Sequence, residues 1–290
     1  MRARFSTTMS DLLATDERAA LVLADIGPVD LAAGTAAADR VVNVGIREQA
    51  MIGVAAGLSL AGLRPFVHTY APFLVERPFE QIKLDLSHQD LGAVLVSIGA
   101  SYDAAAEGRT HQCPGDIALL GTLPGWRLHT PGHSDEVEAL TRAAATSDDR
   151  QYIRLSTQEN RTAFPTDGRI HPVRGGSGVL VLAIGPLLDA ALEATAGTGH
   201  AVAYTATPVP LDRDGLRELS AGFDRVVVLE PFLEGTTAAA VGAALGGSGI
   251  RIEHIGVGVG EQRRYGTAAD HARLHGLDAS GIRRRLDRLS

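Results

Sequence analysis

Short apolar runs alternate with longer helical patterns along nearly the whole chain. Continuous apolar runs bounded by turn residues are typical of buried strands, and apolar residues spaced three or four positions apart are typical of helices. The alternation predicts stacked βα units around a mostly parallel sheet. In the first part of the chain we expect strands at 20–24, 41–44, 65–69, 93–98, 126–129 and 152–155, and helices at 6–14, 47–61, 77–85, 113–120 and 134–145.

A change in composition divides this pattern into two parts. Residues 156–178 contain Pro165, Pro172 and the run Gly175-Gly176-Ser177-Gly178, which favour turns. The pattern then resumes, with expected strands at 179–184, 201–205, 226–229 and 251–256 and helices at 187–196, 215–222, 236–245 and 282–288. We therefore predict an α/β fold of two open, mostly parallel-sheet domains, with domains at 1–160 and 179–290 and a linker at 161–178.

The composition is that of a globular protein without disulfides. At 290 residues, 45% of them hydrophobic, the chain can bury two cores of ordinary size. Its single cysteine, Cys113, excludes a disulfide framework and a Cys-rich zinc site. No apolar stretch reaches the roughly 18 residues of a membrane helix, and residues 1–20 show no charged start followed by an apolar core. We therefore expect a cytoplasmic protein without a membrane partner.

The charge distribution argues against nucleic acid as a partner. The net charge is −7, and arginines cluster only at 283–285. Lys83 is the only lysine, so Schiff-base chemistry would have to use that residue.

The most informative segment is Gly45-Ile46-Arg47-Glu48-Gln49. It follows the apolar run at 41–44 and opens the small-residue helix expected at 47–61. Glu48 therefore sits at a strand-to-helix corner, at the edge of a core, where a carboxylate can pass a proton near neutral pH. The alternative, from this segment alone, is a first-turn Glu that only favours the helix dipole.

Two further segments follow at characteristic distances from Glu48. One is Thr69-Tyr70-Ala71-Pro72-Phe73, continuing to Arg77 and Gln81, and the other is Glu107-Gly108-Arg109-Thr110-His111-Gln112. In this order the three segments resemble the C-terminal half of the transketolase family of thiamine-diphosphate enzymes. The resemblance covers nearly the whole chain and implies a pyrimidine-binding domain followed by a transketolase-type C-terminal domain.

The resemblance implies a cofactor-binding role for four residues. In the family a Glu hydrogen-bonds the pyrimidine ring and thereby activates thiamine, and Glu48 matches it. Tyr70 and Phe73 match the aromatic pair that clamps this ring, and Arg77 is taken as a further cofactor-binding residue. Without the resemblance, Tyr70 and Phe73 would be interpreted as ordinary core aromatics.

Three residues of the third segment are implied substrate-binding residues. His111 matches the histidine that points at the reacting carbon, which makes it a second catalytic candidate beside Glu48. Glu107 stands where the family has an aspartate, which puts its contact with a substrate hydroxyl in doubt, and Gln112 follows the histidine. The alternative for His111 is a loop histidine bonded to the backbone.

The diphosphate-binding half of the family is missing from the sequence. The resemblance therefore implies a split transketolase, in which thiamine diphosphate and Mg2+ are held by an N-terminal-half partner subunit and this chain holds no metal. Gly53 and Gly57 lie on one face of the helix after Glu48 and permit close helix approach. In the family this helix faces a partner subunit, and an α2β2 assembly is implied.

Three positions whose side chains bind a sugar phosphate in the family carry other residues here. A serine, a histidine and an arginine of the family align with Val29, Gly99 and Thr157. Each lost charge-assisted contact removes about 1.5–3 kcal/mol of phosphate binding. The changes argue against a phosphorylated substrate in the usual pose. Arg161, Arg2 and Arg4 are the candidates that could compensate for the lost contacts.

The resulting hypothesis is a thiamine-dependent transketolase-like transferase, active only with its partner subunit. Its substrate would be a small molecule, and it would pass a two-carbon ketol unit to an unphosphorylated or carrier-bound acceptor. One rival is the β subunit of a 2-oxoacid dehydrogenase first component, which has the same two-domain plan, and another is deoxyxylulose-phosphate synthase. A further alternative is a degenerate, non-catalytic half that stabilises its partner.

Overall fold

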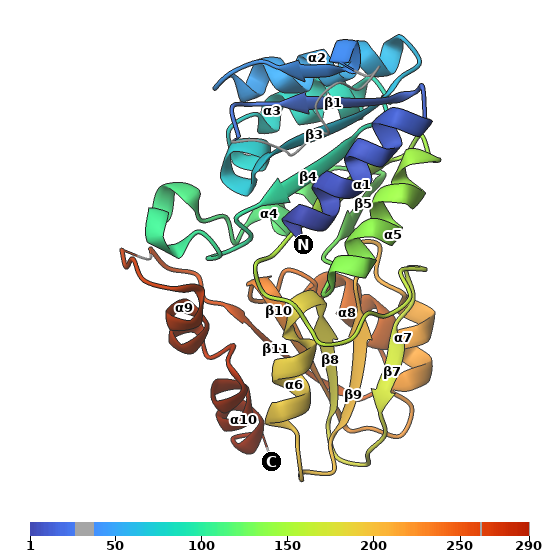
Figure 1. Cartoon of the computed structure of the whole chain (residues 1–290). Coiled ribbons are helices and arrows are strands. Elements are labelled where there is room, and N and C mark those ends of the chain that lie inside the picture. Colours follow the sequence, from blue (N-terminus) through green and yellow to red (C-terminus); the bar gives the residue numbers. More distant parts are fainter. Residues whose placement is uncertain (27–37, 262, 290) are drawn as a thin grey trace.

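The chain forms two α/β units joined end to end (Figure 1). The computed structural model describes residues 1–26, 38–261 and 263–289 of the 290-residue chain. In the first unit a six-stranded, wholly parallel sheet has the order β2-β1-β3-β4-β6-β5. Its strands are β1 (Ala19–Leu23), β2 (Val41–Asn43), β3 (Arg64–Tyr70), β4 (Val94–Ile98), β5 (Trp126–His129) and β6 (Arg150–Arg154).

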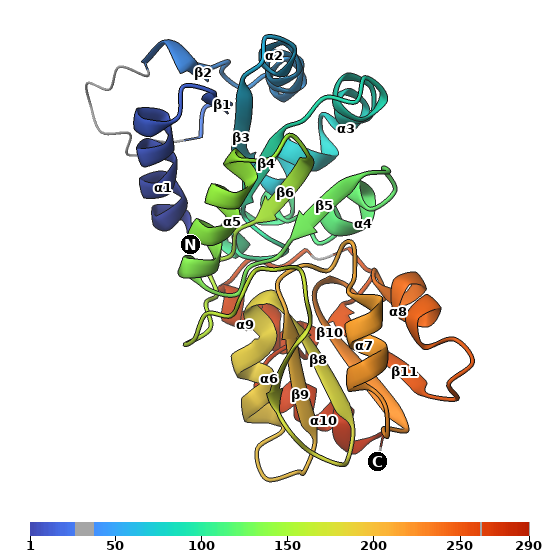
Figure 2. The same ribbon diagram turned by 90° about the vertical axis from the view of Figure 1, so that its right-hand side faces the viewer.

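Helices cover both faces of the first sheet. Strands such as β1 and β4 are therefore buried at every position. Helices α1 and α5 pack together on one face, where Phe5 and Met9 meet Val137 and Leu140. Helices α2 to α4 lie on the other face (Figure 2). The helices are α1 (Arg2–Thr15), α2 (Glu48–Leu60), α3 (Phe79–Gln81), α4 (Asp116–Leu120) and α5 (Ser134–Ala145).

Several tight helical turns connect these elements. Two of them flank α3 and are π-helical, a local winding often found next to functional sites. They replace the single helix expected at 77–85. The turns are η1 (Ala38–Arg40), η2 (Pro72–Glu76), η3 (Ile82–His88), η4 (Ala105–Glu107) and η5 (Arg109–His111).

The second unit has a five-stranded sheet of order β11-β10-β8-β9-β7. All neighbouring strands are parallel except β7, which runs antiparallel to β9 at the edge. The strands are β7 (His171–Arg174), β8 (Leu180–Ile184), β9 (Ala201–Thr205), β10 (Arg225–Leu233) and β11 (Arg251–Val257). The helices are η6 (Gly185–Leu187), α6 (Leu188–Ala194), α7 (Arg213–Leu219), α8 (Ala238–Leu245), α9 (Ala268–His275) and α10 (Ala279–Asp287).

Alternate residues of strand β8 face two different cores. Val181 packs with Leu188 and Ile282 of α6 and α10. Leu182 packs with Leu216 of α7 in a core that continues without a break into the α2 face of the first sheet. Within the described ranges, no helix combines the length and the apolar character needed to cross a membrane.

The predicted fold class is confirmed, and the strands at 126–129 and 201–205 and the helix at 134–145 have the expected bounds. Among the β-strands and α-helices of the described residues, two were not predicted. Helix α9 is one, and β7, inside the expected linker 161–178, is the other. Pro172 is compatible with β7 because an edge strand has one side without ladder hydrogen bonds. We therefore propose that the second domain begins before β7 and not at 179.

A buried ionic network joins the two units. Arg154 of β6 is 1% exposed and donates through Nε to Asp116 Oδ2 at 2.7 Å, and the Tyr152 hydroxyl donates to the same oxygen at 2.7 Å. Arg154 Nη2 also donates to Ser101 Oγ at 2.6 Å, and that hydroxyl donates to the Pro231 carbonyl oxygen in β10 at 2.6 Å. The guanidinium therefore depends on Asp116 for its counter-charge.

We expect Asp116→Asn to lower the free energy of unfolding by about 3–5 kcal/mol, because it leaves a buried guanidinium without a counter-charge. Urea denaturation measures this change. Asp214→Asn is the control, because Asp214 is 94% exposed in its pair with Arg217 and should leave stability unchanged. A loss no larger than that of the control would contradict the assigned network.

His68 is a titratable group inside the first core. Its ring is fully buried, lies 4.8 Å from the ring centroid of Phe5, and has Nδ1 2.8 Å from the Val96 carbonyl oxygen. Nε2 has no hydrogen-bond partner among the described residues. Burial lowers the pKa of His68 to about 4, whereas an unfolded chain has a histidine pKa of about 6.5.

Acid should therefore destabilise the fold partly through His68. Between pH 6.5 and 4 the unfolded chain binds a proton that the folded core rejects, so the free energy of unfolding falls as pH falls. His68→Gln should reduce this fall by up to about 3 kcal/mol, at roughly 1.4 kcal/mol per pKa unit. Urea titrations at several pH values measure it, with the exposed His88→Gln as control. Identical pH profiles for His68→Gln and wild type would refute the assignment.

Candidate active site at the carboxyl ends of the first sheet

A tight corner after β2 places Glu48. The Asn43 side-chain oxygen accepts hydrogen bonds from the backbone N–H groups of Asp25 (3.1 Å) and Gly45 (3.0 Å). Gly45 has φ +70°, a conformation that glycine adopts without a Cβ clash. Helix α2 then begins at Glu48, whose side chain is 2% exposed. The corner therefore turns a carboxylate into the protein at the first turn of a helix.

The Glu48 carboxylate is paired with Arg77. Arg77 Nη1 donates to Glu48 Oε1 at 2.7 Å, and the same guanidinium lies 4.2 Å from the ring centroid of Phe73. Gln49 Nε2 donates to the Arg77 carbonyl oxygen at 3.3 Å, which links α2 to the turn after η2. Glu48 Oε2 forms no hydrogen bond to a residue that the structure describes. One carboxylate oxygen is thus held by Arg77 and the other remains available.

Three rings meet next to this ion pair. The ring centroids of Tyr70 and Phe73 are 6.2 Å apart, and the His111 ring lies 5.2 Å from Tyr70 and 5.0 Å from Phe73. All three contacts are edge-to-face, the geometry that aromatic quadrupoles favour. We call Tyr70, Phe73 and His111 the aromatic cluster. Contacts run continuously from Glu48 through Arg77 and Phe73 to His111.

The loop between β4 and α4 carries His111 and needs glycine at two points. Gly99 has φ +73°, and a Cβ there would lie 2.8 Å from Tyr70 Cδ1, so the histidine of the family would displace the Tyr70 ring. Gly108 has φ +72°, and a Cβ there would lie 2.6 Å from Tyr265 Cε1. The second unit therefore packs directly against the loop.

Two predicted site residues lie outside the aromatic cluster. Glu107 is exposed in η4 and makes no contact with the cluster among the described interactions. Gln112 is 3% exposed, and its Nε2 lacks a partner within the described part of the chain. Gln112 lines a separate cavity of about 360 Å³ between the two units. The structure thus gathers Glu48, Arg77 and the aromatic cluster and leaves Glu107 and Gln112 apart.

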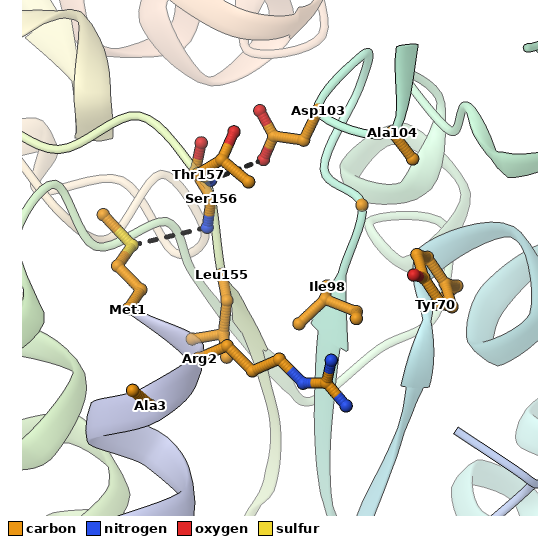
Figure 3. Close-up of a pocket in the computed structure, with 11 residues that line it drawn as sticks. Met1, Arg2, Ala3, Tyr70, Ile98, Asp103, Ala104, Leu155, Ser156 and Thr157 are labelled. Atoms are coloured by element: carbon orange, nitrogen blue, oxygen red, sulfur yellow. Dashed lines mark hydrogen bonds between the residues drawn. The ribbon is translucent and has the colours of Figure 1, made fainter. Parts of the chain in front are cut away.

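A cavity of about 470 Å³ adjoins the aromatic cluster through Tyr70 (Figure 3). It opens at the carboxyl ends of β3, β4 and β6, where ligand sites of open parallel sheets usually lie. Gly99 and Thr157, two of the three changed phosphate positions, line it. The third, Val29, lies outside the described residues. The full lining is Met1, Arg2, Ala3, Tyr70, Ile98, Gly99, Asp103, Ala104, Leu155, Ser156 and Thr157.

The three arginines considered as replacements differ in position. Arg2 lines the cavity. Arg4 instead pairs with Asp135 and Glu138 at 2.9 and 2.8 Å. Arg161 is 88% exposed and is not part of the lining. Of the three, only Arg2 is placed to meet a ligand in this cavity.

Asp103 is a lining residue that sequence patterns did not indicate. Its Oδ2 accepts from the Thr157 backbone N–H at 2.8 Å, and its Oδ1 accepts from Gln158 Nε2 at 3.4 Å. Burial raises the pKa of the Asp103 carboxyl, whereas hydrogen bonds from Thr157 and Ser156 and the charge of Arg154 favour the carboxylate form. None of the three segments singled out in the sequence contains Asp103, and the folding of the loop onto the end of β6 brings it to the cavity.

The residues present fit one half of thiamine diphosphate. A buried carboxylate beside aromatic rings suits a nitrogen heterocycle. Among the described residues, no three His, Cys, Asp or Glu side chains are grouped so that they could hold a metal ion. The described part of the chain therefore offers a place for the ring and no metal site for the diphosphate.

Comparison with known proteins gives a consistent result. Residues 1–162 match the family model described as transketolase, pyrimidine binding domain. The chain is 47% identical over 287 residues to an uncharacterized 33.6 kDa protein in the fasciation locus of Rhodococcoides fascians, which covers 97% of this chain and 92% of that protein.

One further sequence relative and one solved structure also match the chain. The chain is 31% identical over 250 residues to 1-deoxy-D-xylulose-5-phosphate synthase of Polaromonas sp., covering 83% of this chain and 39% of the synthase, so it spans about two fifths of that protein. A solved structure described as a split gene transketolase in an inactive β4 tetramer superposes with a TM-score of 0.83 at 26% identity, covering 99% of this chain and 96% of that one. The chain therefore belongs to the transketolase family of thiamine-diphosphate-dependent proteins, and residues 1–162 form its pyrimidine-binding domain.

Proposed function

We propose that this chain is the pyrimidine-binding subunit of a split, thiamine-diphosphate-dependent transketolase-like enzyme. It transfers a two-carbon ketol unit to an unphosphorylated or carrier-bound acceptor. The observation that carries the proposal is Glu48, 2% exposed and connected through Arg77 and Phe73 to the aromatic cluster. A Glu that only stabilised the first turn of its helix would not require an ion pair with Arg77 next to aromatic rings.

Each residue has a distinct part in the proposed reaction. Thiamine diphosphate, when bound, supplies the acidic carbon that forms and breaks the carbon–carbon bond. Arg77 holds Glu48 Oε1, which leaves Oε2 to exchange a proton with the pyrimidine ring. Tyr70 and Phe73 orient that ring, at about 0.5–1.5 kcal/mol for each aromatic contact beyond its burial.

His111 is the proposed acid–base group on the substrate side. Its Nδ1 lies 2.9 Å from Thr110 Oγ1, which fixes the ring plane. Nε2 has no hydrogen bond to any described residue and so remains free for a substrate oxygen. Glu107 and Gln112 stay proposed substrate-binding residues that would have to act from outside the aromatic cluster.

An N-terminal-half partner subunit is proposed to hold the diphosphate and Mg2+. The described residues offer no metal cluster, and a split gene transketolase structure matches almost the whole chain. Helix α2 and its surroundings expose apolar side chains, with Ile46 72%, Leu60 68% and Leu84 43% accessible. Gly53 and Gly57 are exposed on the same helix. This surface suits a partner subunit in an α2β2 assembly.

A second candidate is a split form of a deoxyketose-phosphate synthase, favoured by 31% identity to 1-deoxy-D-xylulose-5-phosphate synthase over most of this chain. The β subunit of a 2-oxoacid dehydrogenase first component is a further rival with the same domain plan. Assays that compare pyruvate with a ketose as donor separate both from the proposed transfer. A non-catalytic scaffold is opposed by the buried Glu48 carboxylate and its pairing with Arg77.

Glu48→Gln tests the proposal directly. In the complex with the diphosphate-binding chain, thiamine diphosphate and Mg2+, we expect turnover to fall at least about 100-fold, the usual scale for losing a proton-transfer group. Light scattering should show unchanged assembly. The matched control is Glu80→Gln, an exposed residue of α3 that receives the same isosteric change. Equal rates for the two variants would favour the scaffold.

A further inference from the structure

The cavity next to the aromatic cluster leads from Tyr70 along the carboxyl ends of β4 and β6. A substrate that reacts beside Tyr70 and His111 must place the rest of its chain in a neighbouring space. With about 470 Å³, this cavity has room for a small sugar or hydroxyaldehyde. It is therefore the natural place for the distal end of the substrate.

The cavity has mainly apolar walls with two charged side chains. Ile98, Ala104 and Leu155 supply apolar surface. Figure 3 shows the Arg2 side chain extending toward Ile98, whereas Asp103 lies at the opposite end beside Thr157. No ion pair to Asp103 is found within residues 1–26, 38–261 and 263–289. A carboxylate without a salt bridge thus forms one end of the cavity.

The loop that carries Asp103 is fixed from several sides. Ser101 is bonded to Arg154 and to the Pro231 carbonyl oxygen. The ring of Tyr102 stacks on His271 of α9 at a centroid distance of 5.8 Å and an interplanar angle of 15°. The Thr157 N–H then holds one oxygen of the carboxylate. Asp103 therefore cannot move away from an incoming anion without breaking these contacts.

We infer that Asp103 determines substrate specificity in the proposed reaction: it accepts a hydrogen bond from the terminal hydroxyl of an unphosphorylated hydroxyaldehyde and repels sugar phosphates. The inference rests on the proposed function for the reaction itself. Like charges at close range in a partly buried cavity repel strongly, whereas a carboxylate is a strong hydrogen-bond acceptor for a hydroxyl. Thr157 and Gly99 supply no positive charge beside Asp103, and Arg2, the cation of the lining, extends toward Ile98 at the other end of the cavity.

The first experiment compares three-carbon aldehydes in the complex with the diphosphate-binding chain. Wild type should prefer glyceraldehyde to glyceraldehyde 3-phosphate, and to lactaldehyde, which lacks only the terminal hydroxyl. Asp103→Asn should raise the kcat/KM ratio of the phosphate to glyceraldehyde at least about tenfold, mainly through KM. Asp103→Leu should reduce the preference for glyceraldehyde over lactaldehyde by a similar factor. Asp214→Asn, an equal charge change on an exposed residue, should alter neither ratio.

A second experiment uses the chain alone and needs no cofactor. In phosphorus NMR, wild type should not bind millimolar inorganic phosphate, and the double variant Asp103→Asn/Thr157→Arg should bind it. The inference would be overturned if wild type bound phosphate as strongly as the double variant. It would also be overturned if Asp103→Asn and Asp214→Asn gave the same kcat/KM ratio of glyceraldehyde 3-phosphate to glyceraldehyde. If the reconstituted wild type converts no aldehyde while the phosphate result holds, the proposed function fails and the anion-excluding role of Asp103 stands.

Discussion

A carboxylate taken out of water needs a counter-charge, and for Glu48 that charge is Arg77. The pair fixes more than its own two residues. Arg77 lies over Phe73, so the ion pair also sets the position of a ring in the aromatic cluster. The π-helical turn η2, entered directly from β3, brings Arg77 back to the start of α2. The chemistry proposed at this corner depends on that one contact between elements 29 residues apart in sequence.

The second unit shapes the site without contributing a predicted site residue. It touches the loop after β4 at several points: Pro231 accepts from Ser101, Tyr265 lies against Gly108, and Arg109 pairs with Glu261 at 3.4 Å. The loop carries His111, so its geometry depends on both units. The continuous core beneath α4 and α7 gives a physical reason for the two units to hold a fixed arrangement.

The strands were predictable because parallel strands buried on both faces appear as unbroken apolar runs. Glu48, Tyr70, Phe73 and His111 were indicated by motifs, and the structure brings these residues together. Asp103 and the Asp116–Arg154 network could not be found this way, because their partners are distant in sequence and no periodicity marks them. Strand β7 was hidden by Pro172, which suggests a linker unless the strand is known to lie at an edge.

The two carboxylates near the aromatic cluster lie in opposite electrostatic settings. Glu48 has a guanidinium against one oxygen, so its charge is already balanced when a neutral heterocycle approaches. Asp103 lines the cavity and is held by the Thr157 N–H and the Gln158 amide, without an ion pair in the described part of the chain. Under the proposed function, the balanced charge at Glu48 and the carboxylate at the distal end of the cavity would together favour a substrate with no phosphate. In that proposal the asymmetry, more than the loss of family residues at Gly99 and Thr157, distinguishes this chain from one that binds a sugar phosphate.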